Sequence, residues 1–209
     1  MNTAAAIAPP PRTTFKAQML VAREEAIILA VNKLLAEKGF EAMTVDEVAA
    51  AVGIAKASLY KHFPSKEDLA AAAMVRIMKR TQDFMAGLPS DAQPLSKLRS
   101  VARWAMEVQL AGEMPSLPHQ SSSLRTTLMS NRAYIDRLMG VSDTLGGWIQ
   151  AAQADGSISS KLPAIAVLYT LFARACDPVL EFLRVGGNYT DAQIVDMVLD
   201  SCFDGLAAR

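Results

Sequence analysis

Two very short helical segments, separated by a glycine and closed by a proline, restrict the possible folds of this chain more than any other feature. They lie between Thr44 and Leu69, in the stretch TVDEVAAAVGIAKASLYKHFPSKEDL. Gly53 is expected to end the first helix, because glycine readily adopts the left-handed conformation of a helix C-terminus, and Pro64 is expected to end the second. Two short helices joined by a tight turn are typical of a helix-turn-helix, in which the second helix lies in the DNA major groove.

Two helix starts in this stretch carry capping signals. Thr44 is followed three residues later by Glu47, which is the pattern of a capping box. Ser65 is followed by Asp68 at the same spacing, directly before a long apolar-patterned segment. The sequence therefore predicts helix starts just after Thr44 and just after Ser65.

The second short helix has the composition expected of a helix that reads DNA. It begins with small residues, which let the backbone approach the bases, and the basic residues that follow have no acid among them. Over the whole chain of 209 residues, 21 acidic and 21 basic side chains balance, so any contact with nucleic acid must be local. The alternative interpretation is that the basic residues of this short helix form an ordinary solvent-exposed face that does not bind nucleic acid. The basic side chains from residue 54 to 66 are Lys56, Lys61, His62 and Lys66, and a second acid-free stretch holds Arg12, Lys16 and Arg23.

Composition and periodicity favour an all-α chain. Hydrophobic residues make up 51% of the sequence and aromatic residues only 6%, and no convincing run shows the alternating pattern of a strand. The predicted fold class is all-α, with an N-terminal helix-turn-helix domain of three helices and a larger C-terminal helical domain. Further helices are expected at residues 16–38, 66–88, 95–111, 124–130, 132–155, 164–185 (kinked at Pro178) and 191–208.

Catalytic, metal and membrane functions find no support in the sequence. The two histidines are His62 and His119, and no hydrolase, phosphate-loop or metalloprotease motif is present. Cys176 and Cys202 lack metal-ligand spacing, so neither a metal nor a cofactor is expected. The longest uncharged apolar run, 162–173, is far shorter than the roughly 20 residues of a membrane helix. We therefore expect a cytoplasmic protein that is not an enzyme and makes no membrane contact.

The stretch from about Ala26 to Leu69 closely resembles the N-terminal domain of tetracycline-repressor (TetR) family regulators. The similarity is carried by TVDEVA, VGIAKASLYKHF and SKEDL, and by the preceding ILAVNKLLAEKGFEAMT. The remaining two thirds of the chain are similar to the family only in the layout of their helices. The resemblance implies a homodimer that presents one recognition helix to each half of a palindromic double-stranded DNA operator.

The resemblance also implies how the chain is divided. Residues 1–15 are expected to be a disordered tail, 16–64 the helix-turn-helix DNA-binding domain, and 65–209 a helical domain for ligand binding and dimerisation. The last two helices are expected to pair with those of a second subunit, the alternative being that their apolar stripes are buried within one chain. The positions that the resemblance implies for DNA contact are Thr44, Lys56, Ser58, Tyr60, Lys61, His62 and Lys66.

The middle helices of such proteins usually enclose a pocket for a small-molecule effector. Methionine and aromatic walls suit an apolar ligand, because thioethers adapt to its shape. Each of these side chains also fits an ordinary core, and Arg174 also fits an intrahelical pair with Asp177. The candidate wall residues are Trp104, Met106, Met129, Trp148, Tyr169, Phe172 and Arg174, with Met114 and Met139 as further candidates.

The predicted function is a dimeric, sequence-specific transcriptional regulator, a repressor that a small and largely apolar ligand releases from its operator. The alternative is a TetR-like DNA-binding regulator without a small ligand, controlled by a protein partner or acting as an activator. The sequence identifies neither the effector nor the operator.

Overall fold

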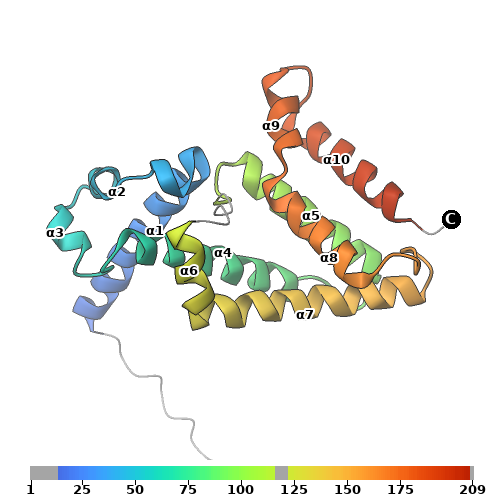
Figure 1. Cartoon of the computed structure of the whole chain (residues 1–209), viewed down its shortest axis with the longest axis horizontal. Helices are drawn as coiled ribbons and strands as arrows, with labels where there is room; N and C mark the ends of the chain where they lie inside the picture. The colour runs from blue at the N-terminus through green and yellow to red at the C-terminus, as the bar shows by residue number, and fades with distance from the viewer. Residues whose placement is uncertain (1–13, 116–121, 208–209) are drawn as a thin grey trace, which may run out of the picture.

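The computed structural model describes residues 14–115 and 122–207, and these ranges contain helices and no strand (Figure 1). The all-α fold class is therefore confirmed, whereas most of the predicted tail, together with His119, lies outside the described residues. Within the described ranges, no helix is long and apolar enough to cross a membrane. The elements are α1 (Phe15–Ala42), α2 (Val45–Val52), α3 (Lys56–Leu59), α4 (Lys66–Ala86), α5 (Pro94–Leu110), α6 (Ser123–Ser130), α7 (Arg132–Ala154), α8 (Ala164–Ala173), the 3-10 helix η1 (Arg174–Cys176), α9 (Pro178–Val185) and α10 (Asp191–Leu206).

The two helix starts that were predicted from capping signals, after Thr44 and after Ser65, are confirmed, and two further helices have side-chain caps. Thr44 and Glu47 form a reciprocal capping box at the start of α2, and Thr190 begins a second one at the start of α10. The side chains of Ser65 and Asn131 cap α4 and α7. Each cap satisfies an N–H group that has no partner inside its own helix, which is why so short a sequence signal is sufficient.

Three elements differ from the prediction. α1 continues past residue 38, although Gly39 interrupts it with a φ of 75° and a ψ of 174°. α3 is a regular helix for only four residues, and a looser helical turn leads from it to Pro64. The segment around Pro178 is not one kinked helix, because the chain forms η1 and then starts α9 at the proline, whose missing N–H needs no partner there. Asp177 caps this new helix by accepting from the Val179 N–H at 3.0 Å.

Two hydrophobic clusters form most of the core. The N-terminal cluster packs α1, α2 and α3 against the first half of α4 and against α6, and its fully buried members include Ile27, Val48 and Leu59. The C-terminal cluster packs α5, α7, α8 and α10 together. Leu69 of α4 belongs to the N-terminal cluster, so the packing continues through α4 across the boundary expected after residue 64.

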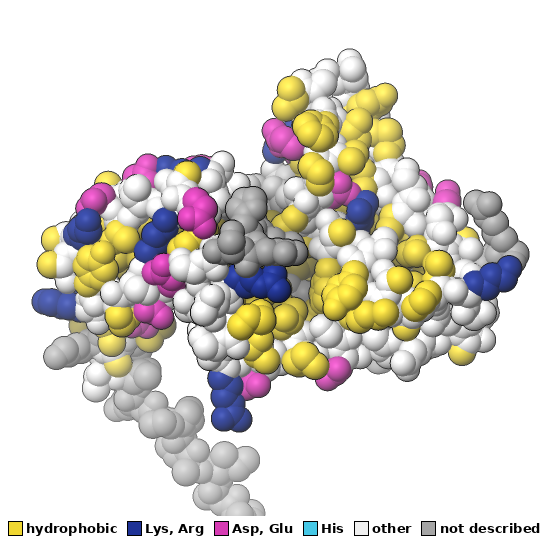
Figure 2. Space-filling model, viewed as in Figure 1, with side chains coloured by type: hydrophobic (Ala, Val, Ile, Leu, Met, Phe, Trp, Pro, Cys, Tyr) yellow, Lys and Arg dark blue, Asp and Glu magenta, His cyan; other side chains and the backbone are white. Residues whose placement is uncertain are grey.

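The apolar stripe of α10 is buried inside the chain. For this helix the structure therefore agrees with the alternative interpretation, in which the stripe packs within one chain and not against a second subunit. Ile194 and Val198 pack in the C-terminal cluster. On the outer face of α10, Asp196 and Asp200 pair with arginines of α5. Figure 2 shows hydrophobic side chains gathered over the neighbouring α9. The exposed apolar side chains of α8 and α9 are Ile165, Tyr169, Val179, Phe182 and Val185.

Candidate nucleic-acid interface

Local interactions fix both ends of α2. The Thr44 Oγ1 accepts from the Glu47 N–H at 3.3 Å, and the Glu47 Oε2 accepts from the Thr44 N–H at 2.9 Å. At the other end, Gly53 has a φ of 71° and its N–H bonds to the carbonyls of Ala49 and Ala50. A Cβ on Gly53 would meet no atom within 4 Å, so the left-handed conformation, and not a lack of space, requires glycine here.

Lys38 of α1 attaches the start of α2 to the first helix. Its ammonium group donates a hydrogen bond to the Glu47 carboxylate. This bond, followed by those from the hydroxyl and the N–H of Thr44, lowers the pKa of Glu47 from 4.5 to about 2. The carboxylate therefore remains charged at physiological pH and interacts favourably with the positive N-terminal end of the α2 dipole.

α3 is anchored by one side chain and presents the others outward. Leu59 is completely buried between α1, α2 and α4 in the N-terminal cluster. Ala55 and Ala57 are exposed at the start of the helix, and Tyr60 at its end is 42% exposed. A single leucine thus holds the helix on the domain while small residues leave its backbone accessible.

The structure pairs Lys56 with an acid that is ten residues away in sequence. The Lys56 Nζ lies 3.0 Å from the Asp46 Oδ2 in the first turn of α2. This hydrogen bond is the main cause of a raised pKa for Lys56. Both side chains are exposed, so solvent screens the pair, but a negative charge nevertheless lies beside the basic helix. The sequence from residue 54 to 66 contains no acid, so sequence reasoning did not reveal that Asp46 lies beside Lys56.

His62 and Lys66 are engaged within the protein. The His62 side chain is only 8% exposed, and its Nδ1 lies 3.2 Å from the Glu24 Oε1 on α1. The Lys66 Nζ donates to the Glu41 carbonyl at 3.2 Å and lies 4.4 Å from the centre of the Phe40 ring. Both residues therefore connect the helix-turn-helix and the start of α4 to α1.

The remaining predicted contact residues lie together at the surface. Lys61 is exposed and forms no salt bridge with any residue that the structure describes. Ser58 is partly exposed on the same short helix. Thr44 is exposed, although its hydroxyl already donates to Glu47 at 2.8 Å. Lys56, Ser58, Tyr60 and Lys61 thus lie on one short, accessible segment of the chain, which we call the α3 surface.

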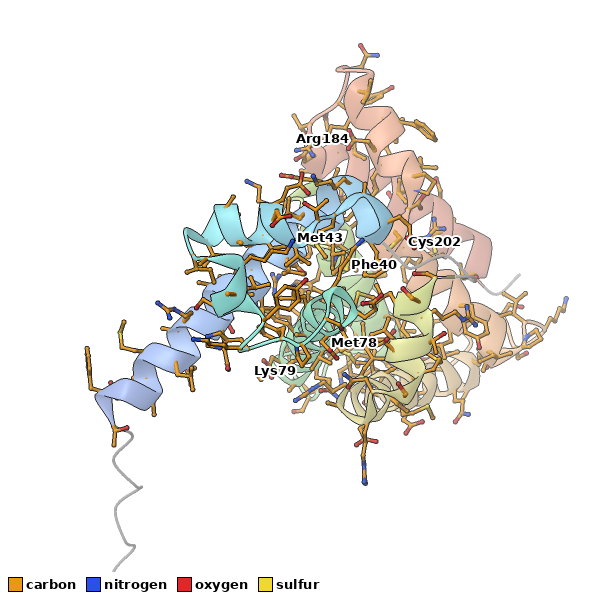
Figure 3. The ribbon with its side chains drawn as sticks, turned by 60° about the vertical axis from the view of Figure 1, so that its left-hand side comes forward. Phe40, Met43, Met78, Lys79, Arg184 and Cys202 are labelled. Carbon is orange, nitrogen blue, oxygen red and sulfur yellow. The ribbon has the colours of Figure 1, made fainter. Side chains whose placement is uncertain are left out.

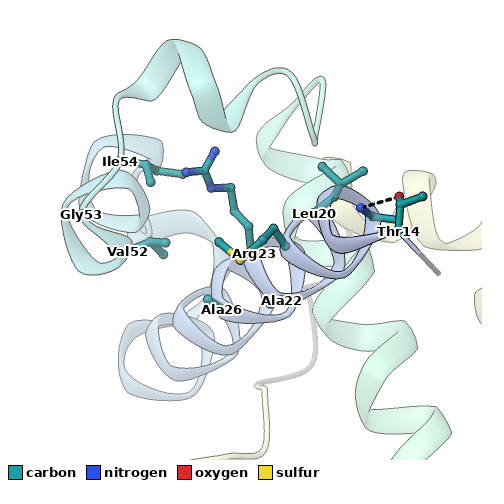
Figure 4. A pocket seen from close by; sticks show the side chains of 10 residues that line it. Thr14, Leu20, Ala22, Arg23, Ala26, Val52, Gly53 and Ile54 are labelled. Atoms are coloured by element: carbon teal, nitrogen blue, oxygen red, sulfur yellow. Dashed lines mark hydrogen bonds between the residues drawn. The ribbon is translucent and has the colours of Figure 1, made fainter. Parts of the chain in front are cut away.

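A groove lies beside the α3 surface, between the N-terminal part of α1 and the turn from Val52 to Ile54. Figure 4 shows that the Arg23 side chain extends from α1 across this groove toward Ile54. The exposed guanidinium adds a positive charge next to the helix-turn-helix. Arg12 and the side chain of Lys16 lie outside the described part of the chain.

A second candidate site is an apolar cavity of about 60 Å³ enclosed by α4, α5, α7 and α8. Of the predicted wall residues, Trp104, Met114 and Phe172 line it. α4 contributes Met78 and Thr81, which sequence reasoning missed because α4 is continuous with the helix-turn-helix and its inner face is revealed only by the packing.

Other predicted wall residues lie away from this cavity. Met106 is fully buried in the C-terminal cluster. Trp148 packs on that cluster, with the Lys97 Nζ 5.7 Å from its ring centre. Arg174 forms the ion pair with Asp177 that was the alternative to a ligand contact, with its Nη1 2.6 Å from the Asp177 Oδ2. The exposed members of the set are Met129, Met139 and Tyr169.

The fold and the α3 surface define a class: an all-helical protein with an N-terminal helix-turn-helix. Residues 27–73 match the family model described as bacterial regulatory proteins, tetR family. The N-terminal segment of the chain therefore carries the DNA-binding domain of the TetR family, as its sequence predicted, and the relatives that the chain matches are DNA-binding transcriptional regulators.

Similarity to known regulators extends over nearly the whole chain. It is 27% identical, over 196 residues, to the HTH-type transcriptional repressor KstR2 of Rhodococcus jostii (strain RHA1), covering 89% of this chain and 91% of KstR2. The fatty acid degradation regulator FadR from Bacillus halodurans superposes with a TM-score of 0.67 at 20% identity, covering 90% of this chain and 97% of FadR. AibR in complex with isovaleryl coenzyme A and operator DNA superposes with a TM-score of 0.62 at 21% identity, covering 87% and 98%. At these identities the two structural matches establish a shared fold.

Proposed function

We propose that the protein is a dimeric, sequence-specific repressor that binds a palindromic operator and leaves it when a small, largely apolar ligand binds. The observation that carries the proposal is the α3 surface, where an accessible short helix presents small and basic residues on a domain of a DNA-binding family. The dimer, the palindrome and the release by ligand go beyond the family assignment and require their own tests.

In this proposal α3 lies in the major groove of the operator. Ala55 and Ala57 allow a close approach, while Lys56 and Ser58 read base edges. Lys61 binds phosphate, which positions the helix without reading sequence. When the complex forms, Lys56 gives up its ion pair with Asp46 and contacts the DNA instead.

The flanking residues hold α3 in place and extend the contact to the phosphates. Tyr60 donates its exposed hydroxyl to a phosphate. Thr44 and Lys66 lie at the N-termini of α2 and α4, where backbone N–H groups and the helix dipole favour an anion. His62 acts mainly as a positioning residue, because it is almost buried against Glu24.

The exposed apolar side chains of α8 and α9 support a dimer. Phe182 is 75% exposed and Val185 is 77% exposed, although both are large and hydrophobic. Contiguous apolar patches on soluble proteins commonly mark protein–protein contacts, and a two-fold contact buries the same patch on both subunits. The proposed interface is the α8–α9 surface, comprising Ile165, Tyr169, Val179, Phe182 and Val185.

The effector site in this proposal is the cavity lined by Trp104 and Phe172. Its volume of about 60 Å³ is far below the roughly 300–1,000 Å³ of typical ligand pockets. A ligand must therefore displace wall side chains, and this displacement is a source of conformational change. An apolar acyl group suits the lining, and isovaleryl coenzyme A is bound to AibR. The small volume equally favours the second candidate, a regulator without a small ligand.

Selection of bound sequences from a random duplex pool at physiological salt tests the proposal. A palindrome whose half-sites lie about one helical turn apart is the expected result. An enriched single half-site contradicts the dimer, and no enrichment contradicts sequence-specific binding by the protein alone. A thermal-shift panel of acyl-coenzyme A thioesters and free fatty acids then distinguishes the ligand-responsive repressor from the ligand-independent regulator.

A further inference from the structure

The C-terminal end of α5 is a junction between three parts of the molecule. The Arg184 Nη1 of α9 donates to the Leu110 carbonyl at 2.7 Å. Gln109 bonds to both backbone groups of Asp177, accepting from its N–H and donating to its carbonyl at 3.0 Å each. The end of α5 is thus tied to the beginning of α9, whose outer face belongs to the α8–α9 surface.

The residues just after α5 are tied to the DNA-binding domain. Asn32, which is only 4% exposed on α1, donates from its Nδ2 to the Glu113 carbonyl at 2.5 Å. The Glu113 carboxylate pairs with the Arg80 Nη2 of α4 at 2.9 Å. One residue therefore contacts the first helix of the DNA-binding domain and the helix that joins the two domains.

The next residue connects this junction to the apolar cavity. Met114 is 9% exposed and packs with Ile77 of α4 in a small third cluster. It lines the cavity beside Trp104 and also lines a crevice between α1, α5 and α9. Figure 3 shows Arg184, another residue of that crevice, on α9 above Phe40 at the end of α1 and above Met43, which follows α1.

We propose that the segment Gly112–Met114 transmits the state of the cavity to the DNA-binding domain through the hydrogen bond from Asn32 to Glu113. This inference rests on the proposed function, because it assigns the route by which an occupied cavity changes DNA binding. A group that enlarges the cavity displaces Met114, and the adjoining Glu113 carbonyl then moves relative to Asn32. α1 follows this movement, and with it the helix-turn-helix that α1 holds through Glu24 and Lys38.

The Asn32 contact is suited to such a role because it is incompletely satisfied. The Asn32 Oδ1 is buried and has no hydrogen-bond partner among the described residues. A buried polar atom without a partner destabilises the arrangement that contains it. A small displacement of Glu113 is therefore less costly than it would be in a fully bonded network.

A double-mutant cycle tests the inference without an identified ligand. Ala105→Val fills the cavity from α5, with Ala102→Val as a second filling variant if the first does not fold. In the wild-type background, filling is expected to weaken binding to the selected duplex at least about fivefold, which is a typical coupling between sites. It is also expected to raise deuterium uptake by the backbone amides of residues 31–38. In the Asn32→Ala background both effects should fall below about half of their wild-type size.

The matched control is Gln82→Ala, which also removes a partly buried amide side chain but one that joins α4 to Arg137 of α7. The effect of filling should persist in that background. Equal effects of filling in the wild-type and Asn32→Ala backgrounds overturn the inference, and so does filling that alters neither affinity nor exchange. If no duplex is bound by any variant, the proposed function fails, while the exchange measurement alone still decides whether Asn32 couples the cavity to α1.

Discussion

The α3 surface and the α8–α9 surface are both exposed, but their side chains differ in chemical type. The first carries small and charged residues, and its charges have neighbours on other helices, such as Asp46 beside Lys56. The second carries large apolar side chains, of which Phe182 and Val185 are three-quarters exposed. Charged contacts with DNA are reversible and depend on salt, whereas apolar surfaces of subunits are suited to lasting burial. In the proposed function, this chain therefore uses one surface for a reversible contact with DNA and another for a lasting contact between subunits.

The largest effect is expected from charges placed on the α8–α9 surface. Phe182→Glu combined with Val185→Glu should convert the dimer into monomers and weaken operator binding by about 100-fold, because central apolar residues dominate interface energies. Light scattering after size exclusion measures the mass, and anisotropy measures the affinity. Met129→Glu, at a 52% exposed methionine on α6, is the control. A double variant that keeps the dimer mass contradicts the interface.

A smaller effect is expected from Lys61→Ala on the α3 surface. Loss of one phosphate contact should weaken binding to every duplex by about tenfold and reduce the slope of log K against log salt by about 0.9. Lys56→Ala should instead change the preference among half-site sequences. Lys33→Ala, which removes an exposed lysine on α1, is the control. An unchanged salt slope in Lys61→Ala excludes its phosphate contact.

Asp46→Asn should act in the opposite direction. It removes the acid that pairs with Lys56 and repels nearby phosphates, so we expect operator affinity to rise about threefold, in the range of exposed charge pairs. The gain should shrink as salt is raised. Asp136→Asn, which removes an exposed acid from α7, serves as the control. Weaker binding by Asp46→Asn indicates that this acid positions Lys56 for the DNA and does not compete with it.

The smallest effect concerns the pH dependence of stability. The folded pKa of Glu47, about 2, lies below its ordinary 4.5, so the stability it contributes is complete above pH 4.5 and is lost as the pH falls toward 2. Glu47→Gln keeps the capping pattern but removes the charge. The melting temperature of the wild type should therefore fall more steeply through this window than that of the variant. Asp83→Asn controls for loss of an exposed ion pair, and parallel curves contradict the role of Glu47.

Local signals made the N-terminal region largely predictable. The Thr44 box, the Gly53 turn and the Ser65 cap each act within a few residues, so a single sequence reveals them. The same signals placed the α3 surface. What they did not reveal were the partners from other helices, Asp46 and Glu24, because these depend on how α1 and α2 cross α3.

The C-terminal region was predictable only in outline. Helix positions followed from periodicity and caps, but methionine and aromatic residues look alike in sequence whether they line a cavity, fill a core or face solvent. Trp104 lines the cavity, Met106 is buried and Tyr169 is exposed, and only the packing separates the three. Likewise, the apolar stripe of α10 was open to either a partner or the chain's own core until its contact with α5 was known.

In the proposed function, the small size of the cavity also affects how fast the protein responds to its effector. A space of about 60 Å³ has no room for an effector until Trp104 or Phe172 has moved. Association that waits for such an opening is slower than simple docking, and escape must wait for the same event. The proposed ligand-responsive repressor is therefore expected to leave its operator slowly after the effector appears and to return to it slowly after the effector has disappeared.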